Sequence, residues 1–216
     1  MKCTVSDIES FRYWKASEYD PDAKELIAQL RKQTPPTPEM ATGSAFHKAL
    51  EYARNGEYEH LGADGYRFYI KTGLEIELPE LREVMFPAKI YRIGNQEVRV
   101  TGRVDCLLGK RIDDHKTTGE FKPERYLDSF QWRFYLDMFN ADHFRWNVFV
   151  LWEMNQKDLP DCPDFEDGKE FLVAELHRLD QYRYPEMTYD LHLLLYQFVD
   201  FAQVHLPERF AEKIAA

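Results

Sequence analysis

Apolar residues at helical spacing mark the first part of the chain. Ile8, Phe11 and Trp14 recur with a period close to 3.6 residues, and they follow a Ser6–Glu9 pattern typical of a capping box. This predicts a first helix that begins at Ser6. Two more helices are expected, on either side of a proline-rich connector, at 22–32 and 39–54. The passage 55–73 has no clear pattern.

The middle of the chain alternates between apolar and polar positions, as a half-buried strand does. Val98 and Val100 alternate with Arg99 and Thr101, after a turn that contains Gly94, so a hairpin is expected. Strands are predicted at 82–93, 97–108, 111–117, 144–153 and 169–177. Helices are predicted at 123–140, at 185–204 and in a short tail after 207. This order predicts an α/β fold with a central mixed β-sheet, a meander plus further strands, flanked by helices.

The composition is that of one globular domain. Of 216 residues, 44% are hydrophobic and 31% are charged, which is enough to bury a core. We expect an N-terminal helical part (about 1–75), a sheet core (about 80–180) and C-terminal helices (about 185–216). No apolar run has the length of a transmembrane helix, and the N-terminus lacks the apolar region of a secretory signal, so a cytoplasmic protein is expected. Three unclustered cysteines argue against a disulfide framework and against a cysteine-rich metal site.

The net charge gives only a weak indication of the partner. With 28 Lys and Arg against 38 Asp and Glu, the formal charge of −10 argues at first against nucleic acid. The segment 98–133, however, holds eight basic and six acidic residues, whereas 151–170 holds seven acidic residues and two lysines. The central segment therefore matters more than the total. The acidic segment is either a solvated connector, a shield for the site or a contact for a partner protein.

Two carboxylates and an ammonium are expected to meet at one edge of the sheet. Asp114 and Lys116 share one face of their strand, and the tight turn at Gly109 brings Asp105 back alongside. Neighbouring carboxylates repel each other, and a hard divalent cation relieves that repulsion. Such an ion activates water for attack on a phosphodiester, while a lysine offsets the developing charge. A solvated strand end with an ordinary ion pair would also fit these residues.

Two further pairs of polar residues lie one helical turn apart. His47 and Glu51 share a face of one predicted helix, and Gln131 and Tyr135 share a face of another. Each pair alone also fits an ordinary amphipathic helix, and a lone helical histidine is more often a surface or core residue. Their order along the chain, together with the carboxylates between them, is more specific than either pair.

In this order the motifs resemble a known family. They are G-x-x-x-H-x-x-L-E from Gly43, G-R-x-D from Gly102, D-x-K-T from Asp114 and Q-x-x-x-Y from Gln131. Together they look like the RecB-type, lambda-exonuclease-like branch of the PD-(D/E)xK nuclease superfamily, and the likeness covers about residues 4–155. The resemblance implies a single nuclease domain with a restriction-endonuclease-like core. His115 departs from the family, which often has an aromatic residue there, and its ring is expected to pack against a helix.

The resemblance implies a role for each matching residue. Four ligands of Mg²⁺ or Mn²⁺ are implied: His47, Asp105, Asp114 and the backbone carbonyl of His115. The implied catalytic residues are Asp105, Asp114, Lys116, Gln131 and Tyr135. Glu51 would hold His47 in place without binding the ion itself, and Glu83 is a weaker candidate for an extra acidic ligand. No iron–sulfur cluster is expected, since the cysteine cluster that binds it in some relatives is missing.

Basic and aromatic residues around the motifs are candidates for contacts with DNA. The basic ones are Arg99, Arg103, Lys110, Arg111, Lys122, Arg125 and Arg133. The aromatic ones either stack on unpaired bases or belong to the core, which their helical spacing favours: Tyr126, Phe130, Trp132 and Phe134.

The expected function is that of a Mg²⁺-dependent deoxyribonuclease, an exonuclease of recombination or repair. Similar phage-type enzymes work beside a single-strand annealing protein, which is the partner the resemblance implies besides DNA. No membrane partner is expected, and the sequence favours no oligomeric state. Two other hypotheses remain open at this point: a catalytically silent nuclease-fold module that binds DNA or protein, and an acidic interaction domain unrelated to nucleic acid.

Overall fold

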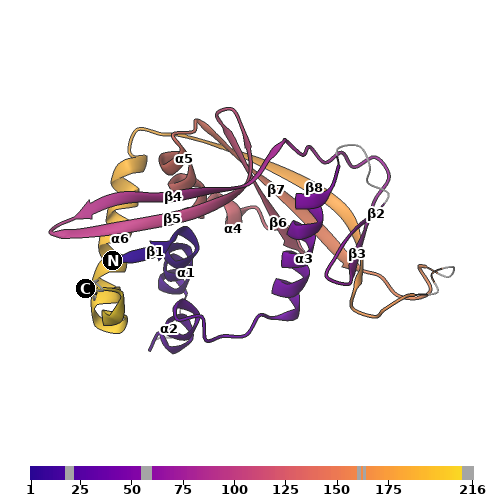
Figure 1. The fold of residues 1–216 in the computed structure, drawn as a ribbon, viewed down its shortest axis with the longest axis horizontal. Helices are drawn as coiled ribbons and strands as arrows, with labels where there is room; N and C mark the ends of the chain where they lie inside the picture. Colours follow the sequence, from indigo (N-terminus) through magenta and orange to yellow (C-terminus); the bar gives the residue numbers. More distant parts are fainter. Residues whose placement is uncertain (18–21, 55–59, 160–161, 163, 211–216) are drawn as a thin grey trace, which may run out of the picture.

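The protein is described by a computed structural model that covers residues 1–17, 22–54, 60–159, 162 and 164–210. These residues form an eight-stranded mixed β-sheet with helices on both faces (Figure 1). The strands are β1 Lys2–Thr4, β2 His60–Ala63, β3 Tyr66–Ile70, β4 Leu81–Ile93, β5 Gln96–Leu108, β6 Arg111–Thr118, β7 His143–Glu153 and β8 Glu170–Tyr182. The helices are α1 Val5–Ala16, α2 Lys24–Leu30, α3 Pro38–Tyr52, α4 Glu124–Leu127, α5 Gln131–Phe139 and α6 Met187–His205, followed by a 3₁₀ turn at Pro207–Arg209. The predicted fold class is confirmed.

Strand β5 organises the sheet because it pairs with three neighbours. The strands follow the order β1-β5-β6-β7-β8-β3-β2, and β4 pairs with the other edge of β5. The β4–β5 and β5–β6 pairs are antiparallel, as the predicted meander requires, whereas β6 and β7 run parallel. A parallel pair needs a crossover connection, and α4 and α5 supply it.

The structure adds elements that the sequence pattern did not predict. The passage without a clear pattern contains β2 and β3, and β1 precedes the first helix, so the N-terminal part is not helical throughout. The single helix expected at 123–140 is two, α4 and α5. The first helix also starts earlier than expected. Its capping box consists of Thr4 and Asp7, not of Ser6 and Glu9, and Glu9 is therefore free for another contact.

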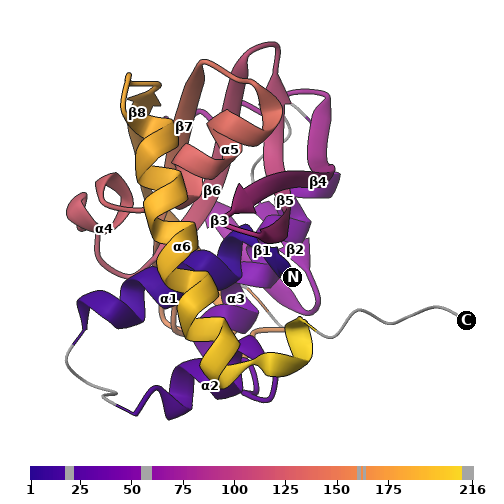
Figure 2. The same ribbon diagram turned by 90° about the vertical axis from the view of Figure 1, so that its left-hand side faces the viewer.

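The core lies on both faces of the sheet. In β7, Trp146 and Val148 belong to one apolar cluster, whereas Phe149 and Leu151 belong to the other, because successive side chains point to opposite faces. Helices α1, α5 and α6 cover the first cluster and α3 covers the second (Figures 1 and 2). Three of the four aromatic candidates are core residues, as their spacing favours: Tyr126, Trp132 and Phe134. No helix among the described residues has both the length and the apolarity needed to span a membrane.

Two glycines of the motifs allow close contacts between elements. A Cβ atom on Gly102 would lie 2.6 Å from Cε1 of Tyr135, so the α5 tyrosine packs directly on the β5 backbone. A Cβ atom on Gly43 would lie 3.0 Å from the hydroxyl oxygen of Thr117, which brings α3 against β6. The glycines therefore set how closely the two helices with polar i, i+4 pairs approach the strands that carry the carboxylates.

Candidate metal centre and active site

The site lies where strands β5 and β6 separate. Their backbone pairing ends at Cys106 and Asp113. One residue further on, the carboxylate of Asp105 accepts the backbone N–H of His115 at 2.6 Å. A side chain thus takes the place of the next ladder bond, and it fixes the Asp105 carboxylate at the point where the strands diverge.

Three side chains from different elements meet at this point. Ligand atoms of His47 on α3, Glu83 on β4 and Asp105 on β5 all lie within 4.8 Å of one another. The Nδ1 atom of His47 is 3.5 Å from Oδ1 of Asp105. One imidazole nitrogen and two carboxylates form a donor set that suits a divalent cation such as Mn²⁺ or Mg²⁺. The ligand cluster therefore contains Glu83, which the sequence ranked as a weak candidate.

Glu83 reaches the cluster through an unusual backbone conformation. Its φ angle is 53°, which is uncommon for a residue other than glycine, asparagine or aspartate. Arg82 and Val84 on either side pair with β5, so the distortion is local to Glu83. Oε2 of Glu83 also forms an ion pair with Nε of Arg103, at 2.7 Å. Backbone strain of this kind persists only where surrounding contacts hold it, and it often occurs at functional sites.

Asp114 is engaged by two side chains instead of joining this cluster. It is almost fully buried, its Oδ2 forms a short ion pair with Nζ of Lys116, and its Oδ1 accepts Nε2 of Gln131 at 2.9 Å. Gln131 lies 3.4 Å from the hydroxyl of Tyr135, one turn along α5. The ammonium of Lys116 is also 5.2 Å from the ring centroid of Trp146, a cation–π contact.

The pKa values of Asp105 and Asp114 are shifted in opposite directions. Burial alone would raise the pKa of Asp105, but the hydrogen bond and charge of His47 and the charge of Lys116 hold it well below its usual value. Burial raises the pKa of Asp114 to about 6, because Lys116 offsets only part of the desolvation. Such divergence between neighbouring carboxylates is typical of catalytic sites.

The two cations of the site are each stabilised by these carboxylates. Burial would lower the pKa of His47, yet the hydrogen bond and charge of Asp105 outweigh it, and the pKa is raised. Burial likewise opposes the charge of Lys116, but Asp114 and Asp105 raise its pKa overall, so it remains an ammonium. The charges of His47 and Asp105 in the ligand cluster and the charge of Lys116 therefore influence one another's pKa values.

His115 contributes its backbone to the site and its ring to the interior. The ring is buried, its Nε2 lies 3.4 Å from Sγ of Cys106, and it meets Phe149 edge-on with centroids 5.6 Å apart. Burial lowers its pKa to about 4, so the ring is neutral. The ring also lies near α3, with its centroid 6.3 Å from that of His47, in line with the expected packing of this ring against a helix.

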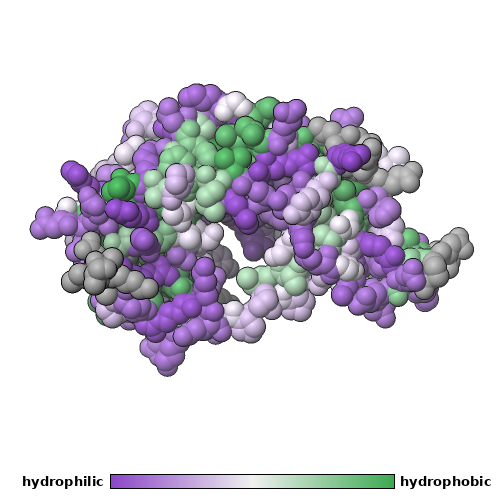
Figure 3. Space-filling model, in the orientation of Figure 1, coloured by the Kyte–Doolittle hydropathy of each residue, from purple (hydrophilic) through white to green (hydrophobic). Residues whose placement is uncertain are grey.

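Two grooves meet at Lys116 and Thr117. The α3 groove, of about 610 Å³, is bordered by His47, Glu51, Glu83, Arg103, Met40 and Tyr52 among others. The α1 groove, of about 420 Å³, is bordered by Ser6, Arg12, Tyr13, Arg125, Tyr126 and Gln131 among others. The surface is hollowed between the two halves of the molecule (Figure 3). A chain-like substrate lying along both grooves would pass directly over Lys116.

The basic candidates divide between these grooves and other places. Arg103 and Arg125 border the grooves, and so do Arg12 and Lys48, which were not predicted because they lie outside the basic central segment. Lys122 is exposed beside its ion-pair partner Glu120. Lys110 donates to the carbonyl of Asn140, at the turn of the β5–β6 hairpin.

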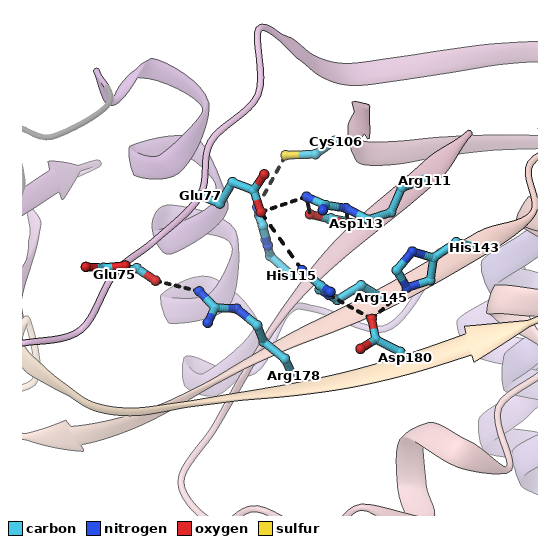
Figure 4. A network of polar contacts seen from close by, with 10 residues as sticks. All are labelled: Glu75, Glu77, Cys106, Arg111, Asp113, His115, His143, Arg145, Arg178 and Asp180. Atoms are coloured by element: carbon cyan, nitrogen blue, oxygen red, sulfur yellow. Dashed lines mark hydrogen bonds and ion pairs between the residues drawn. The ribbon is translucent and has the colours of Figure 1, made fainter. Parts of the chain in front are cut away.

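Two other arginines have structural partners. Arg133 donates to the hydroxyl of Tyr184 at 3.0 Å and to the carbonyl of Ser129 at 2.8 Å, and its guanidinium lies over the rings of Phe130 and Trp132. Arg111 pairs with Asp113 and Glu77, both at 2.8 Å. Arg111 belongs to a network that crosses β6, β7 and β8 and includes Arg145 and Asp180 (Figure 4). We therefore keep only Arg103 and Arg125 of the predicted set as groove residues.

Comparison with known proteins gives a likeness at the level of structure. No protein-family model matches the chain, and neither does any curated protein. The crystal structure of SSO0001 is similar with a TM-score of 0.53 and 14% identity, over 93% of this chain and 75% of that one. The likeness is one of fold. LHK-Exo, in its crystal structure with dAMP, has a TM-score of 0.47 and 15% identity, over 99% of this chain and 95% of that one.

Proposed function

We propose that this protein is a metal-dependent nuclease that hydrolyses phosphodiester bonds in DNA, and that it belongs to the RecB-type branch of the PD-(D/E)xK superfamily. The observation that carries the proposal is the gathering of His47, Glu83 and Asp105 within 4.8 Å, beside Lys116 and at the junction of two grooves. A merely solvated strand end would not bring together partly buried side chains from α3, β4, β5 and β6.

In this proposal His47, Glu83 and Asp105 hold the ion, with Asp114 beside them. A bound divalent cation supplies an activated water and polarises the scissile phosphate. Lys116, held by Asp114, offsets the negative charge that develops on the phosphoryl oxygens. Gln131 keeps Asp114 in place, and Tyr135 contacts Gln131. Arg103 and Arg125 lie where they can contact phosphates on either side of the scissile bond.

The more specific part of the proposal rests on the resemblance to the nuclease family. We propose exonuclease action on DNA ends, with Mg²⁺ or Mn²⁺ as cofactor, in recombination or repair of the phage type beside an annealing protein. The full chain should be incubated with end-labelled linear duplex, linear single-stranded DNA and closed circles, with Mg²⁺, Mn²⁺ or EDTA. Shortening of linear DNA that needs metal and spares circles is the expected result. Binding without cleavage of any substrate would instead favour the catalytically silent module.

The metal centre predicts a pH dependence that can be measured without DNA. Because the pKa of His47 is raised above its usual 6.5, much of this imidazole carries a proton near pH 6 and must lose it to bind a metal. The affinity for Mn²⁺ should therefore rise between pH 6 and pH 8, by up to about tenfold per unit on the acid side. Isothermal titration calorimetry at several pH values measures this. The His47→Gln variant should bind more weakly and with a flatter pH profile, and a wild-type affinity independent of pH would contradict the assignment.

A further inference from the structure

Glu9, which the sequence pattern assigned to a capping box, makes a long-range contact instead. Its Oε2 accepts the backbone N–H of Phe130 at 2.8 Å, across 121 positions of the chain. Its Oε1 accepts Nε of Arg12, one turn along the same helix, at 2.8 Å. The side chain is only 21% exposed. The Glu9 carboxylate of α1 is thus bound to Phe130, the residue that directly precedes α5.

Helix α5 depends on this contact at its N-terminus. Its N-cap residue is Phe130, whose side chain cannot accept a hydrogen bond, and the helix has no cap of its own. Glu9 satisfies the N–H of Phe130, and the hydroxyl of Ser129 accepts the N–H of Gln131 at 3.1 Å. A negative charge at this end is also favoured by the helix dipole. The carboxylate of Glu9 therefore binds the backbone at the point where α5 begins.

The first residue of α5 is the one that contacts the site. Gln131 directly follows Phe130, and its amide donates to Asp114, which in turn holds Lys116. A displacement of the α5 start would move this amide first. The rest of the helix is anchored separately, since Tyr135 packs on Gly102 one turn away. The contact at Phe130 is thus connected to Lys116 through two hydrogen-bonded side chains.

We infer that Glu9 is a positioning residue, which acts through Phe130 and Gln131 to hold Asp114 and Lys116 in their catalytic arrangement. The inference rests on the proposed nuclease function. Glu9 lies outside the ligand cluster, and its partly buried side chain borders the α1 groove. Its loss should lower kcat by more than it changes KM for DNA, since Arg12, Arg125 and the other basic residues of the grooves are retained.

A double-mutant cycle tests this. Glu9→Ala and Gln131→Ala should each lower kcat by about tenfold, and the double variant should be no slower than Gln131→Ala alone, because both changes remove the same hydrogen-bonded connection. Glu9→Gln should retain most of the activity, since its amide oxygen can still accept the Phe130 N–H. Losses that multiply in the double variant, or an equal loss in Glu9→Gln and Glu9→Ala, would overturn the inference.

The matched control is Asp7→Ala, which removes another carboxylate from the same helix. Asp7 accepts the N–H of Thr4 and pairs with Arg209, so its loss should lower thermal stability but not kcat. A second readout is independent of cleavage. The side-chain NH₂ protons of Gln131 in ¹⁵N NMR spectra should exchange about tenfold faster in Glu9→Ala, but not in Asp7→Ala or Glu9→Gln. If wild type cleaves no DNA, the nuclease proposal fails, while unchanged exchange in Glu9→Ala would separately refute the positioning role.

Discussion

Replacing Asp105 with asparagine should lower the rate of DNA cleavage by at least about 1,000-fold and the affinity for Mn²⁺ by more than about 100-fold. The amide oxygen of asparagine can still accept the His115 N–H, so the separation of β5 and β6 should persist. What is lost is the anionic ligand and the charge that faces His47. Cleavage rates on end-labelled linear DNA and calorimetric Mn²⁺ titrations measure the two effects.

The control for this variant is Asp142→Asn, the same substitution near the turn of the β5–β6 hairpin. Asp142 is exposed and lies 3.9 Å from Lys110 in a weak surface pair, far along the hairpin from the site. It should retain wild-type cleavage and metal binding. Undiminished Mn²⁺ affinity in Asp105→Asn, with a native fold, would show that the ion is held elsewhere and would refute the proposed centre.

The sequence carried enough information for those parts of the site that depend on local geometry. Asp114 and Lys116 are two residues apart on a strand, and Gln131 and Tyr135 are one helical turn apart, so their periods alone place them on common faces. Their mutual contacts in the structure follow the spacing. The approach of β5 to β6 was also predictable, because the turn at Gly109 fixes the register of a hairpin.

The parts that were missed, or ranked as weak candidates, depend on contacts distant in the chain. Glu83 enters the ligand cluster through a left-handed backbone conformation, which no apolar pattern encodes. Glu9 stands three residues after Ser6 and so fits a capping box, yet Thr4 and Asp7 form the capping box of α1. Glu9 instead accepts the N–H of Phe130 at the start of α5. Strands β2 and β3 are four and five residues long, too short for alternation to stand out.

The same reason explains why basic residues were poorly assigned. Charge and position along the chain placed Arg111 and Arg133 near the motifs, but each donates to structural partners that only the fold brings close. Arg12 and Lys48 face the grooves although they lie outside the basic central segment. Which cations remain available to phosphates is thus decided by their tertiary partners, and charge counts along the sequence do not reveal it.

Replacing Lys116 with methionine should separate catalysis from metal binding. The variant should cleave DNA about 1,000-fold more slowly, because the charge that faces the developing phosphoryl anion is removed. Its Mn²⁺ affinity should stay within a few-fold of wild type, since His47, Glu83 and Asp105 are untouched. Asp114 loses its cationic partner, so its pKa, already raised to about 6 by burial, should rise further. The residual activity should consequently be confined to higher pH than that of wild type.

Lys169→Met is a closely matched control for this variant. The two lysine side chains are 34% and 33% exposed, each pairs with a carboxylate, and each ammonium lies over an aromatic ring, that of Trp146 for Lys116 and that of Tyr66 for Lys169. The chemical change is therefore the same, but Lys169 borders neither groove. Lys169→Met should cleave DNA at the wild-type rate. If Lys116→Met loses Mn²⁺ binding as severely as Asp105→Asn, then Lys116 serves to assemble the metal centre, and its assignment to the transition state is wrong.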